Sequence, residues 1–445
     1  MPRYEIDINK KYSFPKEIAV INHKNKFLVI TSATANWIVL ESDAQLEVFN
    51  YLRNEHSISD ALNREFDDDD VTYVVTQIEA RNLYGKQVHN TTEEERCLHL
   101  YLTNRCNLSC PHCYMFSGKA NEKELSTSEI LKLLHDYKYI AKGKRVVLSG
   151  GEPTIHQDFE LILKEAYNMG LEIRLMTNGS LLTEECVKRI SQYLISVQIS
   201  IDGYSEETNK QIRGVGHFKK ALGVVDAFVR TGIETSVAIT PRAESLSKHI
   251  DDYVSFAMSL SEKYKEDNFV VKFSEGIAEG RYTSLSKAQN KQYSELILEI
   301  ERRIYGEQYE LMTFVERFSN NAIMNNCMFG IFAIASNGDA YLCAEIGGQN
   351  TIGNIRNVPF ETICLEAASA EVATSVSNLR PCNTCEIRFI CGGGCRIHEF
   401  PALSKVNSYQ NLDHGIISPR VCEPEMKDKF YDLMIDSNEY LFVTV

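Results

Sequence analysis

The chain has 445 residues, enough for about three domains that each bury a core. Its 44% hydrophobic and 24% charged residues are ordinary for a globular protein and exclude a mainly disordered, collagenous or coiled-coil chain. The net charge of −14 argues against a nucleic-acid partner, because such affinity rests on Lys and Arg neutralising phosphates. Since we find neither an apolar run of roughly 18 residues nor a secretory signal, we expect a cytoplasmic protein with no membrane partner.

The chain contains 13 cysteines. In a large chain without an export signal, cysteines indicate metal or redox ligands before they indicate disulfides. Residues 1–89 contain none, whereas residues 327–422 contain eight, seven of them in an ordered spacing. The spacing of the cysteines therefore decides the functional interpretation.

Residues 1–89 predict a small winged-helix-like module of three strands followed by three helices. The expected strands are 18–21, 26–31 and 37–40, and the expected helices are 43–54, 57–66 and 71–83. Ser57 is a candidate N-cap, and the run from Asp67 to Asp70 suits a helix N-terminus. The module has 10 basic and 14 acidic residues, which argues against DNA binding and leaves a structural role as one alternative. The polar segment 89–96 is the expected linker.

The middle region alternates apolar runs with helical patterns, which predicts parallel strands joined by right-handed crossovers. The expected strands are 98–102, 145–148, 172–176, 196–201, 234–239 and 269–273, and the expected helices are 127–141, 158–169, 184–193, 218–231 and 246–262. Six units favour an α/β fold with a partial (β/α)6 TIM-like barrel. In such folds the chemistry lies on loops at the carboxyl ends of the strands.

The loop after the first strand contains Cys106, Cys110 and Cys113 in the spacing C-x3-C-x2-C. Three thiolates on one short loop can hold a [4Fe–4S] cluster and leave one iron open to a substrate or cofactor. A zinc site or three core cysteines are the alternatives. His112 and Tyr114 flank the last cysteine.

The loop after the second strand is Gly150-Gly151-Glu152-Pro153. Its glycines allow the backbone to approach a ligand closely, and Glu152 with backbone carbonyls could hold a ligand ammonium. Alone, this sequence indicates only a turn. Next to an open iron–sulfur site, it is a strong functional signal.

These two motifs together resemble the radical S-adenosylmethionine (SAM) superfamily, in which the open iron chelates the amino and carboxylate groups of the methionine part of SAM. The resemblance implies that the GGEP segment contacts the amino group, that Ser200 bonds the ribose or carboxylate, and that Arg213 pairs the carboxylate. Asn178 could instead belong only to a turn, and Arg213 could be only a surface charge. The SAM contacts implied by the resemblance are His112, Tyr114, Gly150, Gly151, Glu152, Pro153, Asn178, Ser200, Asp202 and Arg213.

The C-terminal cysteines follow the spacing C-x2-C-x5-C-x3-C, which taken alone also fits a zinc ribbon. With Cys327, Cys343 and Cys422 they resemble the SPASM extension of radical SAM enzymes. This resemblance implies one auxiliary [4Fe–4S] cluster on Cys382, Cys385, Cys391 and Cys422, and a second on Cys327, Cys343 and Cys395. The second set lacks a fourth cysteine, so its iron would be open or bound by a non-cysteine or substrate ligand.

Four further residues have weaker sequence evidence for a functional role. Glu345 lies near the place where some relatives carry a catalytic acid, which makes it a candidate general base; a paired or solvated carboxylate is the alternative. Cys97, Cys186 and Cys364 fall outside the motifs and are expected to be small buried side chains. For Cys364, the only one of the three near the auxiliary cysteines, cluster ligation is the alternative.

The segment that begins at Trp37, with the helices after it, resembles a PqqD-like peptide-recognition element, which binds a leader peptide as an added strand beside its third helix. The expected domains are therefore this element (1–89), a radical SAM barrel (95–305) and a SPASM domain (306–445). The resemblance implies a peptide maturase with SAM and three [4Fe–4S] clusters, reduced by a flavodoxin- or ferredoxin-type donor. A 5′-deoxyadenosyl radical would oxidatively cross-link a ribosomally made precursor peptide, with a cysteine thioether favoured. A carbon–carbon link, sulfatase-maturase-like oxidation and a non-catalytic zinc protein are the alternatives.

Overall fold

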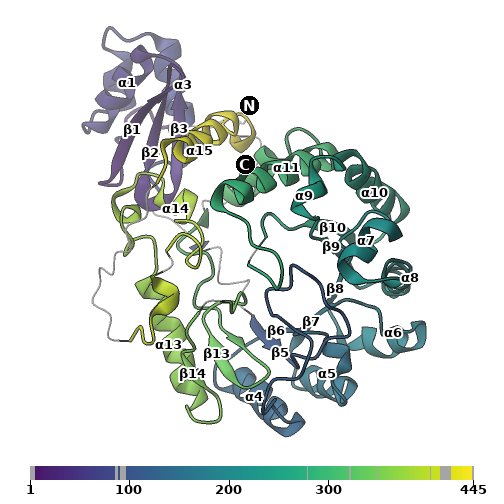
Figure 1. The fold of residues 1–445 in the computed structure, drawn as a ribbon. Coiled ribbons are helices and arrows are strands. Elements are labelled where there is room, and N and C mark those ends of the chain that lie inside the picture. Colours follow the sequence, from purple (N-terminus) through teal and green to yellow (C-terminus); the bar gives the residue numbers. More distant parts are fainter. Residues whose placement is uncertain are drawn as a thin grey trace.

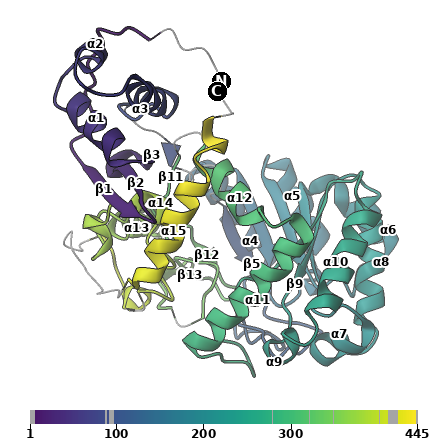
Figure 2. The ribbon, with the colours of Figure 1, turned by 90° about the horizontal axis from the view of Figure 1, so that it is seen from above.

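The structure is a computed structural model that describes residues 6–85, 89–90, 97–277, 279–319, 322–347, 349–400, 402–410 and 422–442. Its centre is a nine-stranded sheet in the order β10-β9-β8-β7-β6-β5-β12-β13-β14. Figures 1 and 2 show the helices of the middle region around this sheet and the N-terminal module to one side of it. Within the described ranges, no helix combines the length and apolar character that a membrane crossing requires.

Six consecutive strands of this sheet run parallel in chain order, which confirms an α/β fold with a mostly parallel sheet. All six predicted apolar runs form strands: β5 (Leu98–Tyr101), β6 (Arg145–Ser149), β7 (Glu172–Thr177), β8 (Ser196–Ser200), β9 (Glu234–Ile239) and β10 (Phe269–Phe273). The helices between and after them are α4 (Thr127–Tyr139), α5 (Phe159–Asn168), α6 (Glu184–Ile190), α7 (Glu206–Arg213), α8 (His217–Val229), α9 (Ala243–Leu246), α10 (Ile250–Lys263) and α11 (Lys287–Tyr305). Because the strands are parallel, their carboxyl ends meet at one edge of the sheet.

The N-terminal module contains the three expected strands and three expected helices. The antiparallel sheet has the order β1-β2-β3, formed by β1 (Ile18–His23), β2 (Lys26–Thr31) and β3 (Asn36–Leu40), and it is followed by α1 (Asp43–Arg53), α2 (Ile58–Leu62) and α3 (Asp68–Ala80). Ser57 caps α2 as predicted, and Asp67 caps α3 by accepting hydrogen bonds from two backbone N–H groups of its first turn. The expected linker begins with β4 (His89–Asn90), which pairs with β11 (Ala322–Ile323), and residues 91–96 lie outside the described residues.

The sheet of this module is buried on both faces. Its inner face packs on the helices of the module, and its outer face packs on α12 (Tyr309–Phe318) and α15 (Pro424–Asp436). Trp37 is fully buried on the outer face, where its Nε1 donates to the Met434 carbonyl at 3.0 Å. The N-terminal module is therefore packed against the rest of the chain.

The C-terminal region continues the central sheet. β12 (Ala333–Ile334) lies parallel to β5, and β13 (Asp339–Tyr341) and β14 (Gly353–Asn354) follow antiparallel. After them come α13 (Phe360–Ala373) and α14 (Arg388–Cys391). This continuity brings the segment after β13, which contains Cys343, next to the end of β5.

Candidate active site

A cavity of about 440 Å³ lies at the carboxyl ends of the parallel strands. Its walls come from the loops after β5, β6, β7 and β8, from α7 and from the segment after β13. The predicted residues that line it are Cys106, Cys110, His112, Cys113, Tyr114, Gly150, Gly151, Asn178, Ser200, Asp202, Arg213 and Glu345. Residues that are far apart in the sequence therefore share one space.

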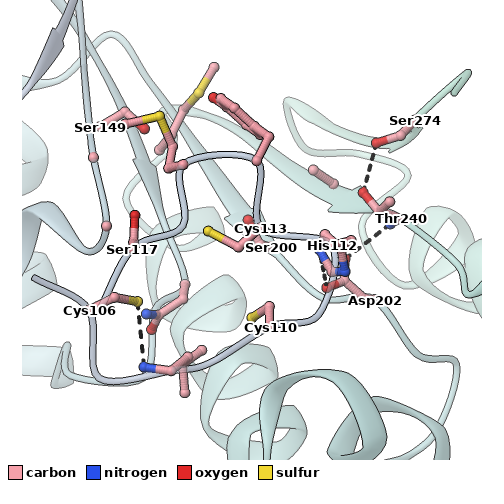
Figure 3. Close-up of a pocket in the computed structure, with 18 of the residues that line it drawn as sticks. Cys106, Cys110, His112, Cys113, Ser117, Ser149, Ser200, Asp202, Thr240 and Ser274 are labelled. Carbon is pink, nitrogen blue, oxygen red and sulfur yellow. Dashed lines mark hydrogen bonds and ion pairs between the residues drawn. The ribbon is translucent and has the colours of Figure 1, made fainter. Parts of the chain in front are cut away.

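The three cysteines of the loop after β5 surround this space (Figure 3). Burial raises the pKa of the Cys106 thiol and raises that of Cys110 to about 11. Thiolates at these positions therefore need a compensating cation, which a bound metal centre supplies. The backbone N–H of Leu108 donates to Cys106 Sγ at 3.4 Å.

Gly150 and Gly151 bring the loop after β6 against the cysteine loop. A Cβ at either position would clash with backbone carbonyls of Thr103 or Arg105, and Gly150 has a positive φ of 133°. The N–H of Gly151 donates to the Thr103 carbonyl at 2.8 Å, and that of Glu152 donates to the Arg105 carbonyl at 2.9 Å. The glycines thus allow two loops to pack closely, in addition to lining the cavity.

The Glu152 carboxylate does not line the cavity, which corrects the expectation that it holds a ligand ammonium. The side chain is fully buried and accepts hydrogen bonds from Thr154 Oγ1 and Thr177 Oγ1, each at 2.6 Å, and from the Asn178 N–H at 2.7 Å. Burial raises the pKa of Glu152. The carboxylate joins the ends of β6 and β7, and Pro153 next to it begins a buried 3-10 turn. Any contact of this segment with a ligand would come from its backbone.

Asp202 anchors a buried charged group on the opposite wall. Arg213 Nε donates to Asp202 Oδ2 at 2.5 Å, and His112 Nε2 lies 3.3 Å from the same oxygen. Burial opposes the charge of Arg213, but the Asp202 carboxylate outweighs it and raises the pKa of Arg213. Burial lowers the pKa of His112. Arg213 therefore forms part of the cavity wall and is not a surface charge.

The segment after β10 clamps the cysteine loop, and no sequence motif predicts this contact. The N–H of Arg281 donates to the Cys113 carbonyl at 3.2 Å, and that of Tyr282 donates to the Pro111 carbonyl at 2.8 Å. The Arg281 guanidinium also donates to Ser109 Oγ at 2.6 Å and to the Ser117 carbonyl. The only available signal was position, because a loop that follows the sixth parallel strand must reach the same edge as the others.

Glu345 both lines the cavity and is paired. Its Oε2 lies 3.0 Å from Nε2 of His398, and this carboxylate raises the pKa of His398 to about 9. The neighbouring Ala344 carbonyl accepts a hydrogen bond from Tyr101 at the end of β5. The segment from Cys343 to Glu345 therefore reaches the cavity wall.

The C-terminal cysteines form two groups. Cys382, Cys385, Cys391 and Cys422 line one cavity of about 150 Å³. In the other group the interaction between the Cys327 and Cys395 thiols lowers the pKa of Cys327 and raises that of Cys395, and Cys343 lies close enough to interact with both.

The three cysteines outside the motifs lie elsewhere in the structure. Cys97 and Cys364 line a separate pocket, and Cys186 is on α6. Cys97 is buried as expected, whereas Cys186 and Cys364 are only partly buried.

The cysteine groups differ in how well they suit a single metal ion and an iron–sulfur cluster. In the part of the chain that the structure describes, no three His, Cys, Asp or Glu side chains converge on a single metal ion. The cysteine loop and the four-cysteine group instead enclose cavities, and such all-thiol sets fit a polynuclear iron–sulfur cluster. A zinc ribbon requires four ligands about 2.3 Å from one ion.

Known proteins match the segment that carries this cavity. Residues 100–248 match the model of the radical SAM superfamily. Mycofactocin maturase MftC of Mycobacterium tuberculosis (strain ATCC 25618 / H37Rv) is 26% identical over 316 residues, covering 68% of this chain and 79% of that protein. Sporulation killing factor maturation protein SkfB of Bacillus subtilis (strain 168) is 28% identical over 249 residues, covering 55% and 58%.

The fold is also similar to that of a solved structure, native anSMEcpe with bound AdoMet. The TM-score is 0.54 at 19% identity, covering 77% of this chain and 99% of that one. The family match begins in β5 and includes the cysteine loop, the GGEP segment and the Asp202–Arg213 pair. These residues form a radical SAM domain, and the chain is a radical SAM enzyme.

Proposed function

We propose that this enzyme oxidatively cross-links a ribosomally made precursor peptide, with a cysteine thioether as the favoured product. The observation that carries the proposal is the single cavity that joins the cysteine loop, the two glycines, the Asp202–Arg213 pair and Glu345. The proposed domains are a leader-binding element (1–89), the radical SAM barrel (95–305) and a SPASM domain (306–445). The peptide substrate is inferred from the sequence relatives, two of which are named as maturation enzymes.

In this proposal Cys106, Cys110 and Cys113 hold a [4Fe–4S] cluster, and SAM occupies the rest of the cavity. With an external low-potential donor, these groups supply a 5′-deoxyadenosyl radical when bound. The backbone of Gly150 and Gly151 forms one wall of the SAM site, and His112, Tyr114, Asn178 and Ser200 contribute other contacts. Arg213, held through Nε by Asp202, presents the remainder of its guanidinium fork for a ligand carboxylate.

The C-terminal thiol groups would hold two auxiliary clusters, one on Cys382, Cys385, Cys391 and Cys422 and one on Cys327, Cys343 and Cys395. Their role follows from the balance of the reaction. Closing a thioether breaks a C–H and an S–H bond and forms a C–S bond; one hydrogen atom leaves with the adenosyl group, and one proton and one electron leave separately. In this proposal Glu345 would accept the proton, and the electron needs an acceptor such as these groups would hold.

A carbon–carbon cross-link has the same balance, with a second C–H bond in place of the S–H bond. We favour the thioether because the Cys327 group has three cysteines, so that its cluster would have room for a substrate thiolate. The similarity to anSMEcpe is one of fold, and the sequence relatives favour a peptide over a folded sulfatase.

The leader would bind the N-terminal sheet, but the edge beside α3 is already occupied. The Trp37 carbonyl accepts from Arg81 Nε at 3.4 Å, and the Val39 carbonyl accepts from the Tyr73 hydroxyl at 3.3 Å. All five residues of β3 are buried, whereas β1 forms the opposite edge and its Val20 is 37% exposed. A strand added beside α3 would therefore have to displace two side chains, which β1 does not require.

The leader's role is best tested with the intact enzyme. Deleting residues 1–89 would expose the apolar faces of α12 and α15, so loss of activity after deletion would not identify a binding role. Turnover of the full precursor should instead be compared with turnover of the core peptide, with the leader absent and then added in trans. Equal turnover of core peptide with and without its leader would refute leader recognition.

The metal content separates this proposal from a zinc protein. Anaerobic reconstitution should give brown protein with about 12 iron atoms per chain, as expected for three [4Fe–4S] clusters. Colourless protein that retains zinc would contradict the proposal. A measured content of about four iron atoms per chain would support the SAM cluster alone and would contradict both auxiliary clusters.

A further inference from the structure

Arg396, which directly follows Cys395, is a charged side chain with no exposed surface. Its guanidinium donates to four backbone carbonyls: Nε to Thr374 at 2.8 Å, Nη1 to Gly392 at 2.9 Å and to Gly394 at 2.5 Å, and Nη2 to Asn325 at 3.3 Å. These four carbonyl oxygens hold the guanidinium in place within the fold. A buried cation of this kind is costly unless anionic groups lie close to it.

The loop around this guanidinium connects the two thiol groups. Gly392, Gly393 and Gly394 lie between Cys391 of one group and Cys395 of the other, and all three have φ between 68° and 78°. A Cβ on Gly393 would lie 3.1 Å from Arg396 Nη1. The glycines are thus required for the chain to turn around the arginine in left-handed conformations.

Arg396 also contacts the second group directly. Its backbone N–H donates to Cys327 Sγ at 3.3 Å, while its side chain holds the carbonyl of Asn325 two residues before that cysteine. One residue therefore fixes the spacing between Cys391 and Cys395 and the approach of Cys327 to Cys395. Hydrogen bonds to cluster sulfurs and nearby charge are among the properties that set iron–sulfur potentials.

We propose that Arg396 is a positioning residue shared by both C-terminal thiol groups, and that its buried charge raises the reduction potential of the cluster on Cys327, Cys343 and Cys395. This inference rests on the proposed function, because it requires these groups to hold clusters. A positive charge stabilises the reduced, more negative cluster, and burial limits its screening by solvent.

The test uses a parent chain in which Cys106, Cys110 and Cys113 are alanine, so that only the C-terminal clusters contribute. Into it we would place Arg396→Lys, Arg396→Met and, as a matched control, Arg81→Met. Arg81 is also a buried arginine that bonds a backbone carbonyl, but it lies in the N-terminal module. Iron per chain and an EPR-monitored redox titration are measured after anaerobic reconstitution.

We expect Arg396→Met to lower the iron content, and the midpoint potential of the cluster signal that remains should be more negative. Arg396→Lys should keep a midpoint nearer that of the parent, because it keeps the charge, and Arg81→Met should match the parent in both measurements. Parental iron and midpoints in Arg396→Met would overturn the inference, as would aggregation of both Arg396 variants, which would assign a general folding role. A parent that binds no iron would instead refute the auxiliary clusters themselves.

Discussion

Gly280→Ala should displace the cysteine loop without changing any residue of the cavity. Gly280 is buried against the backbone of His112, and a Cβ added there would lie 2.6 Å from both the carbonyl carbon and the oxygen of His112. Ordinary contacts begin at 3.4 Å, so the two backbones must separate by about 0.8 Å. That movement would lengthen the Arg281–Cys113 hydrogen bond from 3.2 Å beyond its useful range.

The cost can be taken from the contacts involved. The close contact costs about 1–3 kcal/mol, whether it is retained as overpacking or relieved by giving up the two backbone hydrogen bonds. If this cost falls on the arrangement that binds SAM, affinity should weaken by about 5- to 150-fold. Isothermal titration of SAM into reconstituted enzyme measures the affinity, and iron analysis measures cluster loading.

Gly223→Ala is the matched control, because Gly223 lies exposed on α8 and an added Cβ would meet nothing within 4 Å. This substitution should leave SAM affinity unchanged and stabilise the helix by about 0.5–1 kcal/mol. Wild-type SAM affinity and iron content in Gly280→Ala would refute the clamp, since the loop would then tolerate the displacement.

Three further predictions concern buried groups. Glu152→Gln should lower the free energy of unfolding by about 1–3 kcal/mol in urea, because an amide nitrogen cannot accept the hydrogen bonds that the carboxylate receives; unchanged stability would contradict this. Trp37→Ala should cost about 3–5 kcal/mol, whereas Tyr282→Ala, at a 78% exposed site, should change stability by about 0.5 kcal/mol or less; equal effects would show that the outer face of the N-terminal sheet is not part of the core. Burial, with Glu275 and Glu310, raises the pKa of Glu301 from 4.5 to about 7. The folded state thus prefers protonated Glu301, and wild type should lose stability relative to Glu301→Gln as the pH rises from 4.5 to about 7; a difference that does not change with pH would contradict this.

The strands could be predicted because buried parallel strands are continuous apolar runs, and each of the six runs forms one. Helix α7 was not predicted, because Ile212 is its only buried apolar residue and no apolar periodicity marks it. The helix is set by the capping box at Ser205. Its last residue, Arg213, lines the cavity, and only resemblance to a family singled it out in the sequence.

Side-chain direction could not be predicted from motifs. The GGEP spacing located Glu152 at the site, but only the structure shows that its carboxylate is buried and already bonded by Thr177 and Asn178. Arg281 and Arg396 were missed for another reason. Their partners are backbone carbonyls and thiols brought together by the fold, and backbone groups have no sequence signature.

Transfer of hydrogen from the peptide to SAM is the most direct test of radical cross-linking. Reconstituted enzyme with SAM and a low-potential reductant should be given its precursor peptide with deuterium at candidate acceptor carbons. We expect deuterium in the released 5′-deoxyadenosine and a peptide that has lost two hydrogens for each cross-link. Unlabelled 5′-deoxyadenosine with every labelled peptide, or a peptide of unchanged mass, would contradict it.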